Sequence, residues 1–368
     1  MRYLDVKRTK KKEVKKKSPI FKAIFLVLLG LVVAGMVWAR SLSPMSVFSK
    51  IINPSGLKQT DGRINILLLG LDTRPDRPSS TLTDTVIVGS IDNEGKNATL
   101  ISIPRDLWVP IDDDYSGKIN SAYAIGEADQ DKIDGGITLA KEKVEEVLGI
   151  PIHYYALINF EGFKKAIDIL GGIEVDVENT FDDYHYPIPG REEDTCGITE
   201  DPIKIEDGKE ATQSAEEIYL CRYDHLHFDK GLTKMDGETA LRYARSRYAV
   251  GVEGGDFARA KRQQKVIIAA KNKLLSLPTL LNPGKLKELY DAYGEFVETD
   301  LGISEGQRLL EISQKLEKET IKNAVIDKDS ELVVSPIDSD PYLGASVLIP
   351  KGGDFSQIQA FIQRLLFE

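Results

Sequence analysis

The chain has 368 residues, of which 42% are hydrophobic, and a formal net charge of −10 at pH 7. This length is enough for one large or two smaller domains with a hydrophobic core, and the acidic composition disfavours a nucleic-acid-binding protein. The charge is unevenly placed, because residues 1–22 hold ten Lys and Arg against two acidic residues, which gives +8 and leaves −18 for the rest.

An uncharged segment follows the basic tail at residues 23–39, AIFLVLLGLVVAGMVWA. As a helix it would be about 26 Å long, slightly short of a hydrocarbon core of about 30 Å. Because basic flanks stay on the cytoplasmic side, we expect a single-pass protein of the cell membrane with a cytoplasmic N-terminus. The expected order is a cytoplasmic tail (1–22), a transmembrane helix (23–39), a linker (40–62) and an extracytoplasmic domain (63–368). A cleaved signal peptide and a nucleic-acid-binding basic arm are the alternatives.

The predicted domain opens with three apolar segments. INILLLGLD, residues 64–72, has the near-continuous apolar character of a strand buried on both faces. Thr85–Ile91 and Ala98–Ile103 are two further strands, joined by the turn cluster DNEGKN into a hairpin. If the first strand runs antiparallel to the second, Asp72, the start of the second strand and the end of the third meet at one end of the sheet. Ligands of α/β proteins bind at such strand ends.

Helices and strands then alternate, which is typical of an α/β fold. Asn159 and Asp256 are candidate N-caps of two of the helices. Expected helices cover residues 136–149, 160–172, 236–243, 256–276, 304–318 and 354–366, and expected strands cover 152–160, 173–177 and 332–337.

Residues 180–230 break this alternation and read as a polar surface insertion that holds both cysteines. Outside the membrane Cys196 and Cys221 would be oxidised, and a disulfide closing a loop of about 26 residues is worth about 3.5 kcal/mol in the chain-entropy model. A zinc site that adds His225 and His227 is the alternative, although the spacing matches no common zinc motif.

Arginines are concentrated in residues 242–264. Arg245 and Arg247 are two residues apart and share a side if that segment is extended, whereas Arg259 and Gln263 share one face of a helix. Arginine suits phosphate because its planar fork donates two parallel hydrogen bonds. The pattern therefore indicates an anion clamp.

The alternative for these cations is a solvated helix face with weak surface ion pairs, which we favour for Lys261 and Arg262. Asp72 and Asp84 add two carboxylates that repel each other unless a cation lies between them. A hard, oxygen-liganded ion, Mg²⁺ or Mn²⁺, suits such a site when substrate phosphates complete its shell.

Seven ordered segments carry a resemblance to a known family: ILLLGLDTR, LTDTVIVGSID, LISIPRDLWVPI, KINSAYAIG, YYALINFEGFKKAIDILGGIEVDV, GLTKMDGETALRYARSR and DFARAKRQQ. From about Arg63 to the C-terminus the chain resembles the LytR–CpsA–Psr family. The resemblance implies an α-β-α sandwich, in which a mixed central β-sheet is flanked by helices on both faces. It also implies an extracytoplasmic phosphotransferase, which moves a glycopolymer from an undecaprenyl-pyrophosphate carrier to a cell-wall acceptor, usually peptidoglycan. The implied partners are that lipid-linked polymer, the wall acceptor and the membrane, with no nucleic acid.

The resemblance also assigns roles to individual residues. The metal ligands would be Asp72 and Asp84. The pyrophosphate-binding catalytic arginines would be Arg105, Arg245, Arg247 and Arg259. Supporting substrate contacts would come from Arg74, Asp106, Lys118 and Gln263.

Three features depart from the family pattern. Leu82 stands where many members carry arginine, so that phosphate contact is missing or supplied by Arg74 or Arg77. The loop between Arg247 and Asp256 is longer than usual, and the cysteine-bearing insertion has no fixed counterpart. Family members hold the prenyl tail in an apolar tunnel, for which the candidates here are Ile137, Val144, Val147, Phe160, Phe163 and Ile167; ordinary core packing is the alternative.

Three rival functions remain open at this point. They are a non-catalytic, membrane-anchored binding or regulatory protein, a lipid pyrophosphatase that uses water in place of a sugar, and a transcription regulator. The acidic, extracytoplasmic bulk of the chain disfavours the last.

Overall fold

The computed structural model describes residues 56–72, 82–129, 134–198, 218–276, 279, 282, 284–285, 288–289, 296–338 and 340–368. The expected tail, the expected transmembrane helix and most of the expected linker lie outside these residues. Within the described part of the chain, none of the helices combines the length and apolar character needed to cross a bilayer.

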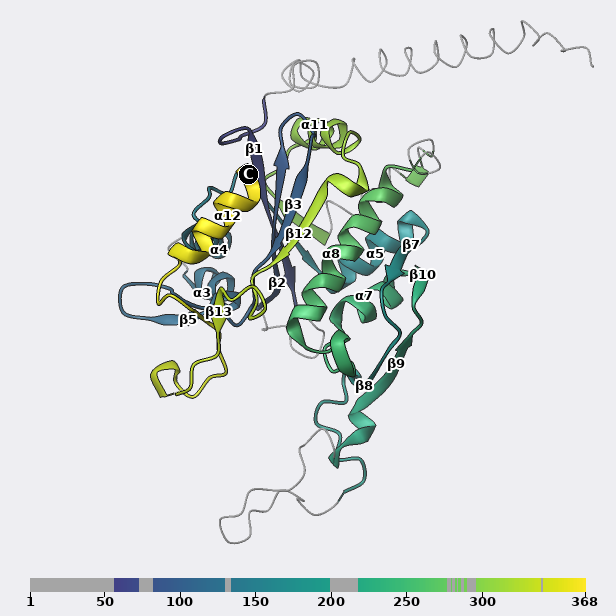
Figure 1. Cartoon of the computed structure of the whole chain (residues 1–368). Coiled ribbons are helices and arrows are strands. Elements are labelled where there is room, and N and C mark those ends of the chain that lie inside the picture. The colour runs from purple at the N-terminus through teal and green to yellow at the C-terminus, as the bar shows by residue number, and fades with distance from the viewer. Residues whose placement is uncertain are drawn as a thin grey trace, which may run out of the picture. The chain divides into compact units, whose positions relative to one another are not determined.

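A six-stranded sheet runs through the middle of the molecule in the order β11-β6-β1-β2-β3-β12 (Figure 1). Its strands are β1 (Arg63–Leu71), β2 (Thr83–Asp92), β3 (Ala98–Ser102), β6 (Tyr154–Asn159), β11 (Val297–Thr299) and β12 (Ile321–Val325). β1 and β3 both run antiparallel to β2, as expected, whereas β6 is parallel to β1 and β12 is parallel to β3. The sheet is therefore mixed.

Helices cover both faces of this sheet, as Figure 1 shows. One side carries α3 (Ala122–Ala128), α4 (Gly135–Leu148) and α12 (Ser356–Phe367). The other carries α5 (Phe160–Leu170), α7 (Gly237–Arg245), α8 (Gly255–Leu274) and α11 (Ile303–Ser313). Leu67 and Leu69 of β1 pack with Val144 of α4, whereas Ile64 and Ile66 pack with Ile312 of α11, so alternate side chains of one strand serve two cores. The expected α/β fold with a mixed, doubly covered sheet is confirmed.

One expected helix cap is confirmed, and several other expected boundaries need correction. Asn159 caps α5 as expected, since its Oδ1 accepts the Gly162 amide at 2.9 Å. Asp256 is not the N-cap of α8; Gly254 holds that position and Asp256 lies in the first turn. The expected helix 304–318 ends at Ser313, and β11 and β12 are strands that the apolar pattern did not indicate.

Short elements complete the described chain. The small strands are β4 (Trp108–Pro110), β5 (Ser116–Lys118), β13 (Val333–Val334) and β14 (Ile349–Pro350), and β13 is what remains of the expected strand 332–337. The 3-10 helices are η1 (Ile119–Ser121), η2 (Leu220–Arg222), η3 (Gly251–Glu253), η4 (Lys318–Thr320) and η5 (Asp340–Tyr342).

The segment 180–230 is more than a surface insertion, which corrects the expectation. It contains a hairpin of β8 (Phe181–Pro187) and β9 (Tyr223–Phe228), and β10 (Gly231–Met235) follows it and pairs with β7 (Ile173–Val177). The hairpin register shifts between Asp183 and Tyr186, where β8 has one residue more than β9. Such a bulge changes the alternation of side chains, and it leaves both Asp183 and Tyr186 buried on the inner face.

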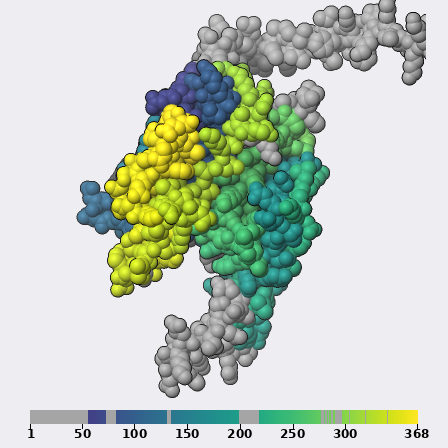
Figure 2. Space-filling view, in the orientation of Figure 1, coloured from purple at the N-terminus to yellow at the C-terminus, as the bar shows by residue number. Residues whose placement is uncertain are grey.

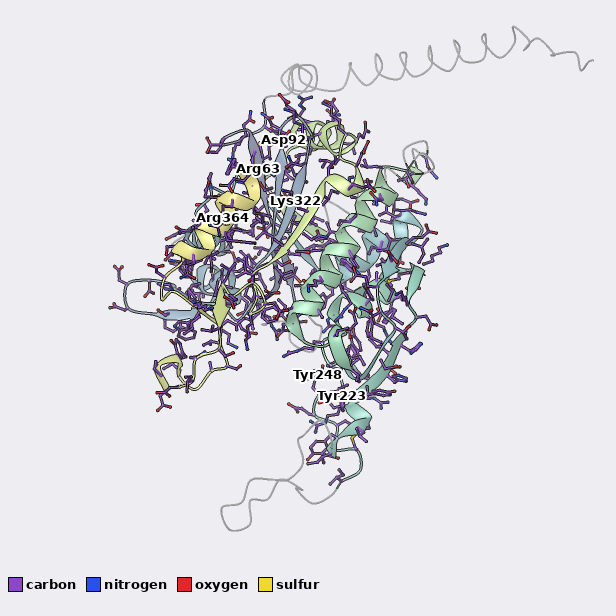
Figure 3. The ribbon with its side chains drawn as sticks, in the orientation of Figure 1. Arg63, Asp92, Tyr223, Tyr248, Lys322 and Arg364 are labelled. Atoms are coloured by element: carbon purple, nitrogen blue, oxygen red, sulfur yellow. A yellow bond between two sulfur atoms is a disulfide. The ribbon has the colours of Figure 1, made fainter. Side chains whose placement is uncertain are left out.

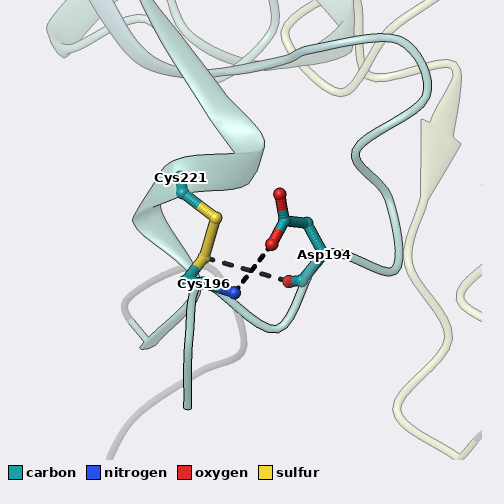
Figure 4. Close-up of side chains that lie close together, drawn as sticks. All are labelled: Asp194, Cys196 and Cys221. Atoms are coloured by element: carbon teal, nitrogen blue, oxygen red, sulfur yellow. Dashed lines mark hydrogen bonds between the residues drawn. A yellow bond between two sulfur atoms is a disulfide. The ribbon is translucent and has the colours of Figure 1, made fainter.

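Cys196 and Cys221 form the expected disulfide, with sulfur atoms 2.05 Å apart (Figure 4). The Cys196 amide donates to Asp194 Oδ1 at 2.9 Å. Because both sulfur atoms are consumed in this bond, the alternative of a zinc site using both thiolates is wrong.

Candidate functional site

The ends of three central strands meet at one edge of the sheet. β1 ends at Leu71 and β2 begins at Thr83, and the Asp72 amide donates to the Leu82 carbonyl at 3.2 Å. β3 ends at Ser102, shortly before Arg105. The antiparallel register therefore brings Asp72, Asp84 and Arg105 to the same edge, as the sequence predicted.

A cavity of about 150 Å³ opens at this edge. Its lining residues are Asp84, Thr85, Arg105, Phe160, Asp183, Tyr186, Pro187, Arg245, Arg247, Tyr248, Arg259 and Gln263. All four arginines that the sequence analysis assigned to phosphate binding are present, together with Gln263 and Asp84. Asp72 is not among the lining residues, and Arg74 and Arg77 lie outside the described residues. Leu82, at the position where arginine was expected, is 39% exposed.

Arg105 is held by a row of acids. Its Nη1 donates to Asp84 Oδ1 at 2.9 Å, and its Nε lies 3.5 Å from Asp106 Oδ2. Burial is the largest influence on the pKa of Arg105 and lowers it, but Asp84, Asp256 and Asp106 together raise the pKa above its usual value. Lys118 donates to Asp106 at 2.6 Å. Neither residue lines the cavity, so they support it indirectly, through the contact of Asp106 with Arg105.

Arg259 is the most enclosed arginine of the cavity, with a side chain only 10% exposed. Its Nη2 lies 2.9 Å from Asp256 Oδ1, and the same oxygen is 3.7 Å from Arg247 Nε. Burial lowers the pKa of Arg259, and the charges of Arg105 and Arg247 lower it further, against Asp256 and Asp84. Desolvated, mutually repelling cations favour an anion in the cavity.

Arg245 and Arg247 both line the cavity, but they do not share one side of an extended segment as expected. Arg245 is the last residue of α7, and Ser246 is the C-cap with φ −50° and ψ 131°, so the two arginines do not lie on one extended segment. The turn at Ser246 nevertheless directs both into the cavity. The Arg245 guanidinium lies 4.3 Å from the Phe160 ring centroid and donates to the Tyr186 hydroxyl at 3.4 Å.

Asp183 fixes this turn from the hairpin side. It is completely buried, and its Oδ2 accepts the Ser246 hydroxyl at 2.6 Å and the Tyr248 amide at 3.2 Å. Its Oδ1 accepts the His185 amide at 3.0 Å. A residue that the sequence analysis placed in a surface insertion therefore positions the arginine-bearing turn.

Arg262 fixes the same turn from the helix side. Its guanidinium donates to the backbone carbonyls of Tyr243, Ser246 and Glu253, and it also pairs with the Glu253 carboxylate at 3.0 Å. Because Arg262 is 1% exposed, the expected solvated helix face is wrong for this residue. Its role is structural all the same, since it does not line the cavity.

Asp183, Tyr186 and Tyr248 are cavity residues that the sequence analysis missed. The segment FDDYHYP has no alternation that separates its buried from its exposed polar residues, because the bulge changes the phase within it. Burial raises the pKa of Tyr186, so its phenol stays protonated near neutral pH.

The candidate tunnel residues divide into three groups. Ile137, Val144 and Val147 pack in the core between α4 and the sheet, and Ile167 and Phe163 pack in the core around α7. Phe160 lines the cavity beside Arg245. Phe160 is therefore the candidate best placed to contact a ligand there.

Comparisons with known proteins agree with this architecture. The chain matches the model of the LytR_cpsA_psr family over residues 41–347. It is 31% identical over 320 residues to the polyisoprenyl-teichoic acid–peptidoglycan teichoic acid transferase TagU of Oceanobacillus iheyensis, covering 83% of this chain and 84% of that one. It is 27% identical over 393 residues to the cell wall biosynthesis protein LcpA of Corynebacterium glutamicum, covering 95% of this chain but only 66% of LcpA.

The fold has a counterpart among solved structures. The crystal structure of Bacillus subtilis TagV superimposes with a TM-score of 0.56 and 25% sequence identity, over 84% of this chain and 98% of TagV. The family match, the arginine cavity and the fold agree, and the chain belongs to the LytR_cpsA_psr family.

Proposed function

We propose that the protein is a membrane-anchored, extracytoplasmic phosphotransferase. It moves a glycopolymer from an undecaprenyl-pyrophosphate carrier to a cell-wall acceptor such as peptidoglycan. The observation that carries this proposal is the convergence of four arginines on one cavity at the edge of the sheet. The names of TagU and LcpA, a teichoic acid transferase and a cell wall biosynthesis protein, support it.

The arginines supply the main chemistry. Arg245, Arg247, Arg259 and Arg105 hold the diphosphate oxygens and stabilise the charge that develops as the bridging bond breaks. A hydroxyl of the acceptor sugar attacks the sugar-proximal phosphorus, which forms a phosphodiester and releases prenyl phosphate. Catalysis in such a site rests on positioning and electrostatics.

We propose further that a divalent cation binds at this edge of the sheet. Asp72 directly follows β1, and Asp84 is the second residue of the adjacent strand β2. Both side chains offer the oxygen ligands that Mg²⁺ or Mn²⁺ prefers. Arg105 occupies one oxygen of Asp84, so a bound ion would share this carboxylate with the guanidinium. When bound, the cation would neutralise charge on the diphosphate.

The arginine role is tested with the full chain in detergent, a prenyl-pyrophosphate-linked glycan and a peptidoglycan acceptor. Arg245→Ala should lower the rate of prenyl phosphate release about 100-fold, because a transition-state donor is lost. Arg364→Ala, which removes an exposed arginine of α12, is the matched control and should leave the rate unchanged. Transfer that survives Arg245→Ala would contradict the proposal. Donor binding without any release would favour the non-catalytic binder, and release without phosphodiester formation would favour the pyrophosphatase.

The cation is tested separately on the same reaction. Chelation with EDTA should abolish turnover, and added Mg²⁺ or Mn²⁺ should restore it. Asp84→Asn should raise the Mg²⁺ concentration needed for half-maximal rate by about tenfold or more, since a charged ligand becomes neutral. Full activity of the wild-type chain after exhaustive chelation would rule the cation out.

A further inference from the structure

A row of aromatic side chains leaves the cavity and continues along the β8–β9 hairpin. Tyr248 lines the cavity, and the Arg247 guanidinium is 5.2 Å from its ring centroid. The ring centroid of His185 is 6.2 Å from that of Tyr248 and 5.5 Å from that of Tyr223. We call Tyr248, His185 and Tyr223 the aromatic row. Figure 3 labels Tyr248 and Tyr223 close together where the hairpin continues into the arm that carries the disulfide.

The bulge in β8 creates this row. It places two consecutive residues of β8, Tyr184 and His185, opposite the single residue His225. Tyr184 stacks on His225 at 4.3 Å, and His185 is turned toward Tyr223 and Tyr248. Bulges commonly re-aim side chains next to active sites.

The row is partly exposed, with His185 and Tyr223 half-buried, unlike the other aromatic cluster of this region. Phe181, Phe228 and Tyr243 stack in the core and are at most 7% exposed. Tyr248, by contrast, is 40% exposed, and Tyr184 beside the row is 53% exposed. Exposed aromatic residues next to a cavity supply rigid contact area at low entropic cost, which suits ligand binding.

Charges of both signs lie along the hairpin, and the Arg247 guanidinium is at its cavity end. The outer face of the hairpin carries the Asp182 carboxylate, which accepts hydrogen bonds from His225 and His227 at 2.7 and 2.8 Å. Asp229 lies at the end of the same face, 3.3 Å from His227. These carboxylates and imidazoles can bind the hydroxyl groups of a sugar.

Given the proposed function, on which this step rests, we propose that the aromatic row is the subsite for the sugar rings of the acceptor glycan strand. The C–H faces of pyranose rings pack on Tyr223, His185 and Tyr248, and the neighbouring carboxylate and imidazole groups take sugar hydroxyls. Because Tyr248 lines the cavity, a strand on the row brings its terminal hydroxyl to the arginines. The row thereby binds the acceptor through its sugar rings, and the cationic cavity binds the diphosphate donor.

The test separates acceptor binding from donor chemistry in the full chain in detergent. Tyr223→Ala should raise the acceptor KM about tenfold, the cost of one lost aromatic contact, with donor KM and acceptor-free donor hydrolysis unchanged. Tyr223→Phe keeps the ring and should restore most of the acceptor KM. Tyr115→Ala removes an exposed tyrosine of the β4–β5 hairpin, outside the row and the cavity, and is the control.

A binding measurement keeps the inference independent of transfer. The full chain should bind an N-acetylglucosamine tetramer by calorimetry, about tenfold more weakly after Tyr223→Ala, with thermal unfolding as the check of folding. If the wild-type chain binds no tetramer and Tyr223→Ala leaves the acceptor KM unchanged, the row is packing alone and the inference is wrong. If Tyr223→Ala raises the donor KM instead, the row binds the donor polymer, which also overturns it. Absence of transfer together with Tyr223-dependent tetramer binding would refute the proposed function but not this subsite.

Discussion

Ser246 is held between two buried groups of opposite charge. Its hydroxyl donates to Asp183, and its carbonyl accepts from Arg262. Asp183 comes from the hairpin and Arg262 from α8, so the turn between the two cavity arginines cannot rotate without breaking contacts to both. Burying these charges is costly, but each is compensated by several hydrogen bonds, which is the condition under which buried charges are tolerated.

Asp183→Ala should therefore affect both stability and donor binding. The change removes the acceptor of one hydroxyl and two backbone amides, and we expect a loss of about 3 kcal/mol in the free energy of unfolding. The donor KM should rise more than kcat falls, because the turn would no longer hold the guanidinium groups of Arg245 and Arg247 together in the cavity. Chemical denaturation and steady-state kinetics measure the two effects.

Two variants serve as controls for Asp183→Ala. Asp183→Asn keeps an acceptor and should recover part of the donor KM. Asp194→Ala removes an exposed carboxylate that also accepts a backbone amide, and it should cost less than about 1 kcal/mol. Equal losses for Asp183→Ala and Asp194→Ala would contradict a positioning role.

At the scale of elements, the β8–β9 hairpin connects the cavity to the arm that carries the disulfide. Its β8 strand walls the cavity through Asp183, Tyr186 and Pro187, and the chain beyond Pro187 forms an arm closed by the disulfide. In the space-filling view this teal and green part of the surface extends away from the yellow C-terminal helix α12 (Figure 2). The Arg222 guanidinium stacks on Tyr219 at 3.9 Å beside the disulfide, so the described base of the arm is organised locally.

Replacing both cysteines by serine should make the arm more susceptible to proteolysis without changing the activity of the cavity. The chain-entropy cost of opening the loop is about 3.5 kcal/mol, and neither cysteine lines the cavity. Limited proteolysis between residues 187 and 222 should accelerate about tenfold or more, while acceptor-free donor hydrolysis stays within twofold of the wild-type rate. Loss of donor hydrolysis at the same rate as cleavage would show that the arm and the cavity unfold together.

At the scale of the whole molecule, a cationic cavity lies in a strongly acidic body. Residues 56–368 hold 36 Lys and Arg against 56 Asp and Glu, a net charge of −20. The distant field therefore repels an anionic donor, and attraction begins only within reach of the arginines.

Salt should consequently act on this protein in an unusual direction. Raising NaCl from about 20 to about 150 mM shortens the screening length from over 20 Å to about 8 Å, which removes the distant repulsion before the contacts inside the cavity. The association rate of a short-chain prenyl diphosphate, measured by stopped flow, should rise severalfold. A steep fall of that rate with salt would show that long-range attraction dominates instead.

Strands and helices with a local sequence signal were predictable, together with the residues that they bring to the cavity. Elements that are defined by pairing with distant parts of the chain were not. The apolar run of β1 and the DNEGKN turn predict the antiparallel strands that bring Asp72, Asp84 and Arg105 to one edge. The helix after Gly254 places Arg259 and Gln263 on one face, and both line the cavity. The edge strand β11 and the polar strand β12 have no apolar signal of their own, because pairing with β6 and β3 defines them.

The cavity wall shows the same division. Arg262 could not be recognised as buried, because only the folded turn brings the carbonyls of Tyr243, Ser246 and Glu253 around its guanidinium. Tyr186 could not be placed on the inner face, because strict alternation puts it on the opposite face from Asp183 and a one-residue bulge reverses that.

That one extra residue in β8 constrains how the protein can diversify. Deleting His185 would return the strand to regular pleating with Asp183 and Tyr186 still on one face, but it would remove the ring that faces Tyr223 and Tyr248. Lengthening the chain beyond Pro187 leaves the pairing untouched. The spacing from Asp183 to Tyr186 therefore limits insertions and deletions within β8, whereas the chain beyond Pro187 can change in length without altering that spacing.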